Sequence, residues 1–227
     1  MLKAIHISRT GRNVASFFEE QNAWLVFALL CLGYGATAYI QDAFIITKEV
    51  YYNTLGEQLT IERIDTMLEK QAEWKFISYL LIPFVVFLQA SLITLCLSCG
   101  TILMNHKVRF YALFRLVLRS SVVFLMGKLA FTFILLFSNI QIFDDLVSVN
   151  KFALSGFVSK ESIPAWLMYP LSILNIFEAA FWLLLTLGLS RLLQKPFRAA
   201  FGFVATTYGI GLLIWVVFII FLQLNLS

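Results

Sequence analysis

Long apolar stretches alternate with shorter polar stretches along this chain, and the alternation predicts its architecture. Five apolar runs each supply about the 20 residues that a helix needs to cross a ~30 Å hydrocarbon layer. They lie at residues 23–46, 76–98, 120–137, 165–190 and 201–224. Helices are expected because hydrocarbon requires every backbone N–H and C=O to be paired, and the alternation typical of barrel strands is absent. The pattern therefore predicts one domain, residues 1–227: an all-α integral membrane bundle of five transmembrane helices.

Composition supports a membrane protein. Of the 227 residues, 60% are hydrophobic, 13% are charged and 23 are Phe, which excludes a soluble domain of ordinary composition. The net charge of +4 is small. We therefore expect membrane lipid as a partner and no nucleic acid.

The charges of the connecting segments predict the orientation, because loops rich in Lys and Arg stay in the cytoplasm. Residues 99–119 and 191–200 contain basic residues and no acid, whereas residues 41–75 and 138–164 are acidic overall. This pattern predicts a cytoplasmic N-terminus and an outer C-terminus. The two outer segments contain no glycosylation sequon, which favours the plasma membrane of a bacterium, its inner membrane.

Two amphipathic segments adjoin the spans. Residues 60–75 predict an outer helix that runs directly into the second span, as a cover for the rim of the bundle or as a docking surface. Residues 107–119 predict a helix at headgroup level on the cytoplasmic side. Its basic interfacial stripe consists of Lys107, Arg109, Arg115 and Arg119. Anionic lipid accounts for such a stripe, and protein binding is the alternative.

Parts of the chain are repeated. Residues 94–98 (TLCLS) match residues 186–190 (TLGLS) at four of five positions. The pattern Phe-x-Ala-x-Phe then follows in both cases, at residues 110–114 and 197–201, each time among basic residues. Two interpretations remain open: one extra helix followed by two copies of a helical hairpin, or chance similarity of short apolar segments.

This arrangement resembles the Yip-family membrane proteins, which have a cytoplasmic N-terminus, five spans and a basic, Phe-containing turn after the second span. At residue level the resemblance lies in the turns at 110–114 and 197–201. It implies a non-enzymatic membrane protein that works through associations. The Asp-Leu-Tyr-Gly-Pro motif of the eukaryotic trafficking members is absent, so their partnership with Rab-type GTPases is not carried over.

Lys128 lies within the third predicted span and Glu178 within the fourth, and both side chains are ionisable. Because a charge at mid-bilayer costs at least ~2.5 kcal/mol, such residues usually face the bundle interior and find a partner. One possibility is a direct Lys128–Glu178 pair. In the other, Lys128 reaches toward the cytoplasmic face and Glu178 is hydrogen-bonded to Asn175 or to a neighbouring helix. Together Lys128, Glu178 and Asn175 form the candidate intramembrane polar site.

The remaining candidate chemistry is sparse. Cys96 and Cys99 lie in the last turn of a predicted span, and with His106 they would leave a metal one ligand short. Pro83 predicts a kink in the second span. No catalytic constellation, cofactor motif or complete metal site is present in the sequence. We therefore expect a non-enzymatic accessory or scaffold subunit that associates with other membrane proteins or lipid, and the alternative is a transporter or channel subunit.

Overall fold

All regular elements in the described part of the protein are helical, which confirms the predicted all-α class. The computed structural model describes residues 22–148, 152–157 and 164–226. The elements are α2 (Ala23–Ile40), η1 (Gln41–Ile45), α3 (Lys48–Leu55), α4 (Ile61–Leu103), α5 (Phe110–Ser120), α6 (Val122–Phe137), α7 (Phe143–Ser148), η2 (Leu154–Phe157), α8 (Ala165–Ile173), α9 (Ile176–Leu192), α10 (Phe197–Val204), η4 (Ala205–Gly209) and α11 (Ile210–Leu226). Of the three short η elements, η1 and η4 are π-helical turns and η2 is a 3₁₀ turn.

Four helical stretches in the described residues are long and apolar enough to cross a membrane: Ala23–Ile45, Ile61–Leu103, Phe110–Phe137 and Phe197–Asn225. Their positions match the first, second, third and fifth predicted spans. The predicted fourth span, residues 165–190, consists of two helices, α8 and α9, separated by Leu174 and Asn175. Helix α9 has 17 residues and α8 only 9, so neither alone supplies the roughly 20 residues of a typical span.

The break between α8 and α9 has a local cause and a local compensation. Asn175 adopts an extended conformation, and its side chain accepts a hydrogen bond from the backbone N–H of Glu178, as a helix N-cap does. The backbone groups that the break exposes pair with a short segment, residues 152–154. The Leu154 N–H donates to the Leu174 carbonyl (3.1 Å), and the Ile176 N–H donates to the Phe152 carbonyl (3.3 Å). The interruption is therefore a paired and ordered feature of the fold.

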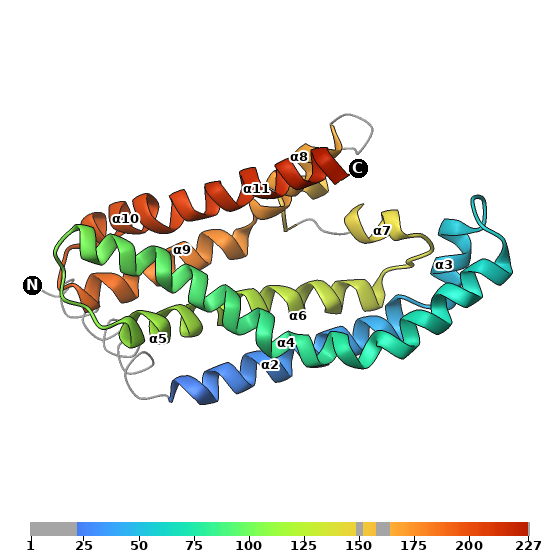
Figure 1. The fold of residues 1–227 in the computed structure, drawn as a ribbon, viewed down its shortest axis with the longest axis horizontal. Helices are drawn as coiled ribbons and strands as arrows, with labels where there is room; N and C mark the ends of the chain where they lie inside the picture. The colour runs from blue at the N-terminus through green and yellow to red at the C-terminus, as the bar shows by residue number, and fades with distance from the viewer. Residues whose placement is uncertain (1–21, 149–151, 158–163, 227) are drawn as a thin grey trace, which may run out of the picture.

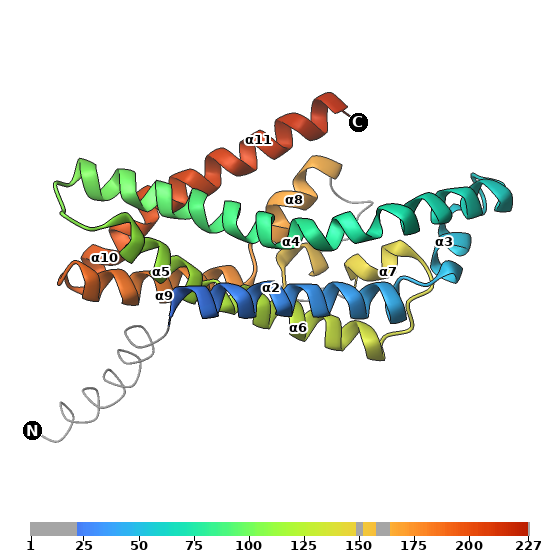
Figure 2. The same cartoon turned by 60° about the horizontal axis from the view of Figure 1, so that its bottom comes forward.

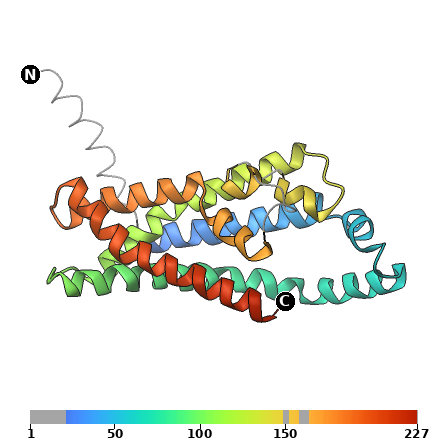
Figure 3. The same ribbon diagram turned by 90° about the horizontal axis from the view of Figure 1, so that it is seen from above.

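The helices lie nearly parallel in an elongated bundle (Figure 1). Helix α4, with 43 residues, is about 65 Å long at 1.5 Å per residue and extends beyond the ends of α6 and α11. Helices α2 and α6 lie side by side (Figure 2), and η4 rests against α4 where α11 begins (Figure 3). The fully buried side chains at the centre come from α2, α4, α5, α9 and α10 and include Leu30, Leu97, Leu113, Phe181 and Val204.

At one end of the bundle, α4 turns into α5 and α9 turns into α10. We call this the turn end (residues 102–110 and 193–198), and Figures 1, 2 and 3 all place both turns there. The two turns have the same backbone structure. In each, a non-glycine residue has a positive φ (Asn105, 55°; Gln194, 52°) and the next N–H bonds back to a carbonyl five residues earlier. These bonds are His106 N–H to Thr101 (2.8 Å) and Lys195 N–H to Ser190 (3.0 Å), the pattern of a Schellman motif.

The helices that leave the two turns are also alike. Phe110 stacks on Phe114 with ring centroids 6.4 Å apart and planes inclined by 17°. Phe197 stacks on Phe201 at 6.4 Å and 18°. The sequence matches at these positions therefore coincide with matching local structure.

Two boundaries differ from the sequence-based expectation. The third span begins at Phe110, ten residues earlier than predicted, so most of the segment expected as a separate interfacial helix forms the first turns of that span. The second span begins at Ile61 and not at residue 76. The outer helix predicted at residues 60–75 continues into it without a break, as expected. Helix α4 continues through Pro83, where a kink was expected. The helical break in a predicted span lies instead at Leu174 and Asn175, between α8 and α9.

Candidate intramembrane site and outer lobe

Glu178 is the centre of a hydrogen-bonded group inside the bundle. Its Oε1 accepts a hydrogen bond from the Trp182 indole N–H (2.8 Å) and another from the Tyr208 hydroxyl (2.7 Å). Trp182 lies one turn further along α9, and Tyr208 belongs to η4. The carboxylate therefore links α9 to the π-helical turn that begins the last span.

The local structure positions each member of this group. Glu178 lies in the first turn of α9, directly after its Asn175 cap, where the partial positive charge of a helix N-terminus favours a carboxylate. Tyr208 is only 6% exposed, and its ring contacts those of Phe181 (5.4 Å between centroids) and Trp182 (5.6 Å). A π-helical turn accommodates an extra residue and occurs frequently at functional sites. Tyr208 is thus held by aromatic packing with its hydroxyl on Glu178.

Lys128 lies near the level of Glu178 but does not pair with it. Helices α6 and α9 pack so that a Cβ added to Gly127 would meet the Phe177 ring, next to Glu178 in sequence. Lys128 itself is half-buried. No ion pair or hydrogen bond joins it to Glu178 or to any other residue that the structure describes. Of the three residues of the predicted polar site, Asn175 and Glu178 are brought together and Lys128 stands apart.

Trp182 and Tyr208 were not predicted as members of this site. Trp182 follows Glu178 by four residues, a spacing that places two side chains on one face of a helix, so a sequence signal for it existed. Tyr208 lies 30 residues from Glu178, and its contribution depends on how η4 packs against α9.

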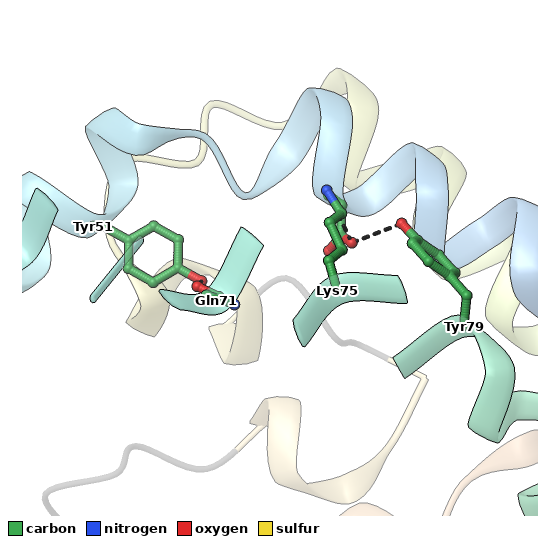
Figure 4. A network of polar contacts seen from close by, with 5 residues as sticks. Tyr51, Gln71, Lys75 and Tyr79 are labelled. Carbon is green, nitrogen blue, oxygen red and sulfur yellow. Dashed lines mark hydrogen bonds and ion pairs between the residues drawn. The ribbon is translucent and has the colours of Figure 1, made fainter. Parts of the chain in front are cut away.

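A second polar group lies at the end of the bundle opposite the turns. We call this region the outer lobe (η1, α3, α7 and residues 61–75 of α4). Figure 4 shows its polar contacts. The Asp42 carboxylate forms an ion pair with Lys75 (3.4 Å) and accepts a hydrogen bond from the Tyr79 hydroxyl (2.9 Å). Nearby, the Tyr51 hydroxyl donates to Gln71 (3.0 Å). These contacts join α4 to η1 and to α3.

Helix α3 and the start of α7 are fixed in the same way. The Tyr52 hydroxyl donates to Asp65, and this bond raises the pKa of the phenol. The Thr54 hydroxyl accepts from the Phe143 N–H (3.1 Å). The N–H groups of Ile142 and Gln141 both donate to the Asp145 carboxylate, and these bonds lower its pKa. The outer lobe is therefore connected by side-chain hydrogen bonds across three segments that are distant in sequence.

The predicted basic interfacial stripe exists only in part. Lys107 and Arg109 are exposed, and the Arg115 guanidinium lies 5.9 Å from the centre of the Tyr111 ring. Arg119, in contrast, is only 3% exposed. It cannot share an exposed stripe because α5 is the start of the third span and its last turns are enclosed by neighbouring helices. Arg119 is thus a correction to the predicted stripe.

The cysteine candidates show no metal geometry in the described residues. Cys31, Cys96 and Cys99 are all free thiols. No group of three His, Cys, Asp or Glu side chains that could hold a metal ion occurs among residues 22–148, 152–157 and 164–226.

Comparisons with known proteins give no further information about the site. No family model, no curated protein and no solved structure matches this chain.

Proposed function

We propose that this chain is a five-span membrane protein that acts as a non-enzymatic accessory or scaffold subunit and associates with other membrane proteins through its outer lobe. The observation that carries the proposal is the lobe itself, built from η1, α3, α7 and the first turns of α4. Its contacts, from Asp42–Lys75 to Thr54–Phe143, hold short polar segments in one arrangement. An ordered surface of this kind, beyond the apolar part of the bundle, suits recognition of another protein.

The five-span count rests on treating α8 and α9 as one interrupted crossing. Together they run from Ala165 to Leu192, and residues 152–154 pair the backbone groups that the interruption exposes. Interrupted helices of this kind occur in membranes where neighbouring protein satisfies the backbone. With this crossing, the hairpins α4–α6 and α9–α11 become two copies of one unit that follow α2. The matching turns at Asn105 and Gln194 support this duplication.

The orientation follows from charge. The turn end carries the basic segments 99–119 and 191–200, and the outer lobe carries the acidic segment 41–75. The turn end is therefore proposed to face the cytoplasm of a bacterium, with the lobe and the C-terminus outside.

The test is a pulldown of the tagged protein in native nanodiscs, followed by mass spectrometry. Ile61 and Met67 are exposed apolar residues on the lobe part of α4 (69% and 48%). The variant Ile61→Ser/Met67→Ser should lose a partner that the wild type retains. The matched control is Ile102→Ser/Leu103→Ser at the turn end, where both side chains are also exposed (74% and 86%). A partner lost from the control and kept by the lobe variant would contradict the proposal, as would a wild type that retains none.

A second candidate function, a transporter or channel subunit, is favoured by the broken crossing at Glu178. Transporters commonly place substrate and ion sites beside discontinuous helices, near the repeat interface. A carboxylate in this position could carry a proton across the site. Proteoliposomes with a pH-sensitive dye inside and an imposed potential would show proton flux in the wild type and none in Glu178→Gln. Wild-type flux equal to that of empty vesicles contradicts this candidate.

A further inference from the structure

Acidic residues gather toward one end of the bundle. Every Asp and Glu that the structure describes, apart from Glu178, lies in residues 42–73 or 144–145, on the side of the outer lobe. The turn end contains Lys and Arg on both hairpins and, in segments 99–119 and 191–200, no acid. An anion that approaches the turn end therefore meets no opposing charge from either turn.

The two turns expose the same combination of groups. In the first, Lys107 and Arg109 are exposed, and Phe110 follows with 44% of its surface exposed. In the second, Lys195 and Arg198 are exposed on either side of Phe197, which is 45% exposed. Each turn thus presents two cations beside an exposed aromatic ring, at the end of helices with apolar surfaces.

The two turns also lie close together in the fold. Helix α4 packs against η4, and α5 packs against α9, so each hairpin contacts the returning helix of the other. Glycines allow this contact: a Cβ on Gly100 would collide with Thr207, and a Cβ on Gly188 would collide with Leu116. The cations of both turns therefore belong to one surface rather than to two separate ends.

We propose that this surface binds the headgroups of anionic phospholipids, with one phosphate-binding turn in each hairpin. The cations would contact the phosphates while Phe110 and Phe197 enter the acyl layer, a combination typical of interfacial lipid binding. Cations near an anionic membrane surface each strengthen binding about fivefold, which is ~1 kcal/mol. The proposal does not rest on the accessory function, because it involves no residue of the outer lobe.

The experiment measures lipid retention by native mass spectrometry of the delipidated full-length protein, titrated with phosphatidylglycerol or with phosphatidylcholine. The variants are Lys107→Gln/Arg109→Gln and Lys195→Gln/Arg198→Gln. Each should weaken phosphatidylglycerol binding about 25-fold and leave phosphatidylcholine binding unchanged. The combined variant should lose the preference for phosphatidylglycerol altogether.

Three controls make the result decisive. Arg63→Gln/Lys70→Gln removes two cations from the outer lobe and should leave the preference intact. Lys107→Arg/Arg109→Lys keeps both charges and should retain binding, which shows that the charges are what the lipid requires. Inorganic phosphate at equal concentration should not displace the lipid, because it lacks the acyl chains that the exposed rings contact. Equal losses from the lobe and turn variants, or displacement by phosphate alone, would overturn the proposal.

Discussion

The hydrogen bond from Tyr208 to Glu178 offers the sharpest test of the intramembrane site. The variant Tyr208→Phe removes one hydroxyl and keeps the ring, so the packing on Phe181 and Trp182 is preserved. It leaves the Glu178 carboxylate with one donor in place of two among the described contacts. Any loss of stability then reports mainly on the bond itself.

The size of the loss can be bounded. Hydrogen bonds to charged groups contribute ~1.5–3 kcal/mol in proteins. Those between helices within membranes average about 0.6 kcal/mol and reach about 1.7 kcal/mol, because the unfolded chain in the membrane also finds partners. The bond measures 2.7 Å and Tyr208 is only 6% exposed, so we expect a value near the upper membrane limit, about 1.5 kcal/mol.

The assay is unfolding in mixed micelles by titration with SDS, followed by far-ultraviolet circular dichroism. Tyr208→Phe is measured in the wild type and in Glu178→Ala, so that the double-mutant cycle isolates the coupling between the two side chains. We expect a coupling of about 1.5 kcal/mol, the value argued above. The control Tyr39→Phe alters a tyrosine that is 62% exposed and should shift stability by less than about 0.5 kcal/mol. A coupling below about 0.3 kcal/mol would refute the interpretation of Glu178 as a link between α9 and η4.

Two further predictions concern packing and pH. Gly188→Ala should destabilise the bundle by about 1–3 kcal/mol in the same SDS assay, because the added methyl group would collide with Leu116, whereas Gly202→Ala, which meets nothing within 4 Å, should be neutral or stabilising. The lowered pKa of Asp145 means that its bonds to the N–H groups of residues 141–142 stabilise the lobe above the ordinary carboxyl range and are lost as the pH falls through the lowered value. The protection factors of those amides, which compare the observed exchange rate with the intrinsic rate at the same pH, should fall at acid pH in the wild type, and Asp145→Asn should remove that fall.

Apolar runs predicted most of the fold because a single physical demand, the pairing of backbone groups in hydrocarbon, determines where such runs form helices. The first, second, third and fifth predicted spans all correspond to helices long enough to cross a membrane. The boundaries were less accurate where polar and apolar character mix. Residues 110–119 carry enough Arg to suggest an interfacial helix, yet tertiary packing encloses Arg119 within the third span.

A hydropathy pattern, which averages over many residues, did not predict the break in the fourth span between α8 and α9. Asn175 was recognised as a polar residue beside Glu178, but its effect as a helix cap depends on an extended backbone that residues 152–154 stabilise. The Tyr208 contact has no sequence signal at all, because it joins residues 30 positions apart through a π-helical turn. In the same way, counting residues from the ends of the spans could not establish whether Lys128 and Glu178 pair, because the side chain of Glu178 turns toward η4.

The outer lobe and the intramembrane site are connected by a continuous series of contacts. Helix α3 packs on α7, α7 packs on η2, and η2 packs on α8. The segment that enters η2 also pairs with the backbone at the break, through Leu154 and Leu174. The next residue, Asn175, caps α9 by accepting a hydrogen bond from the Glu178 N–H. A partner that displaced α3 would therefore disturb the first contact of this series, α3 on α7. Binding at the lobe and polar chemistry at Glu178 are consequently compatible within one protein, and the lobe variant Ile61→Ser/Met67→Ser separates them because it leaves every contact of Glu178 in place.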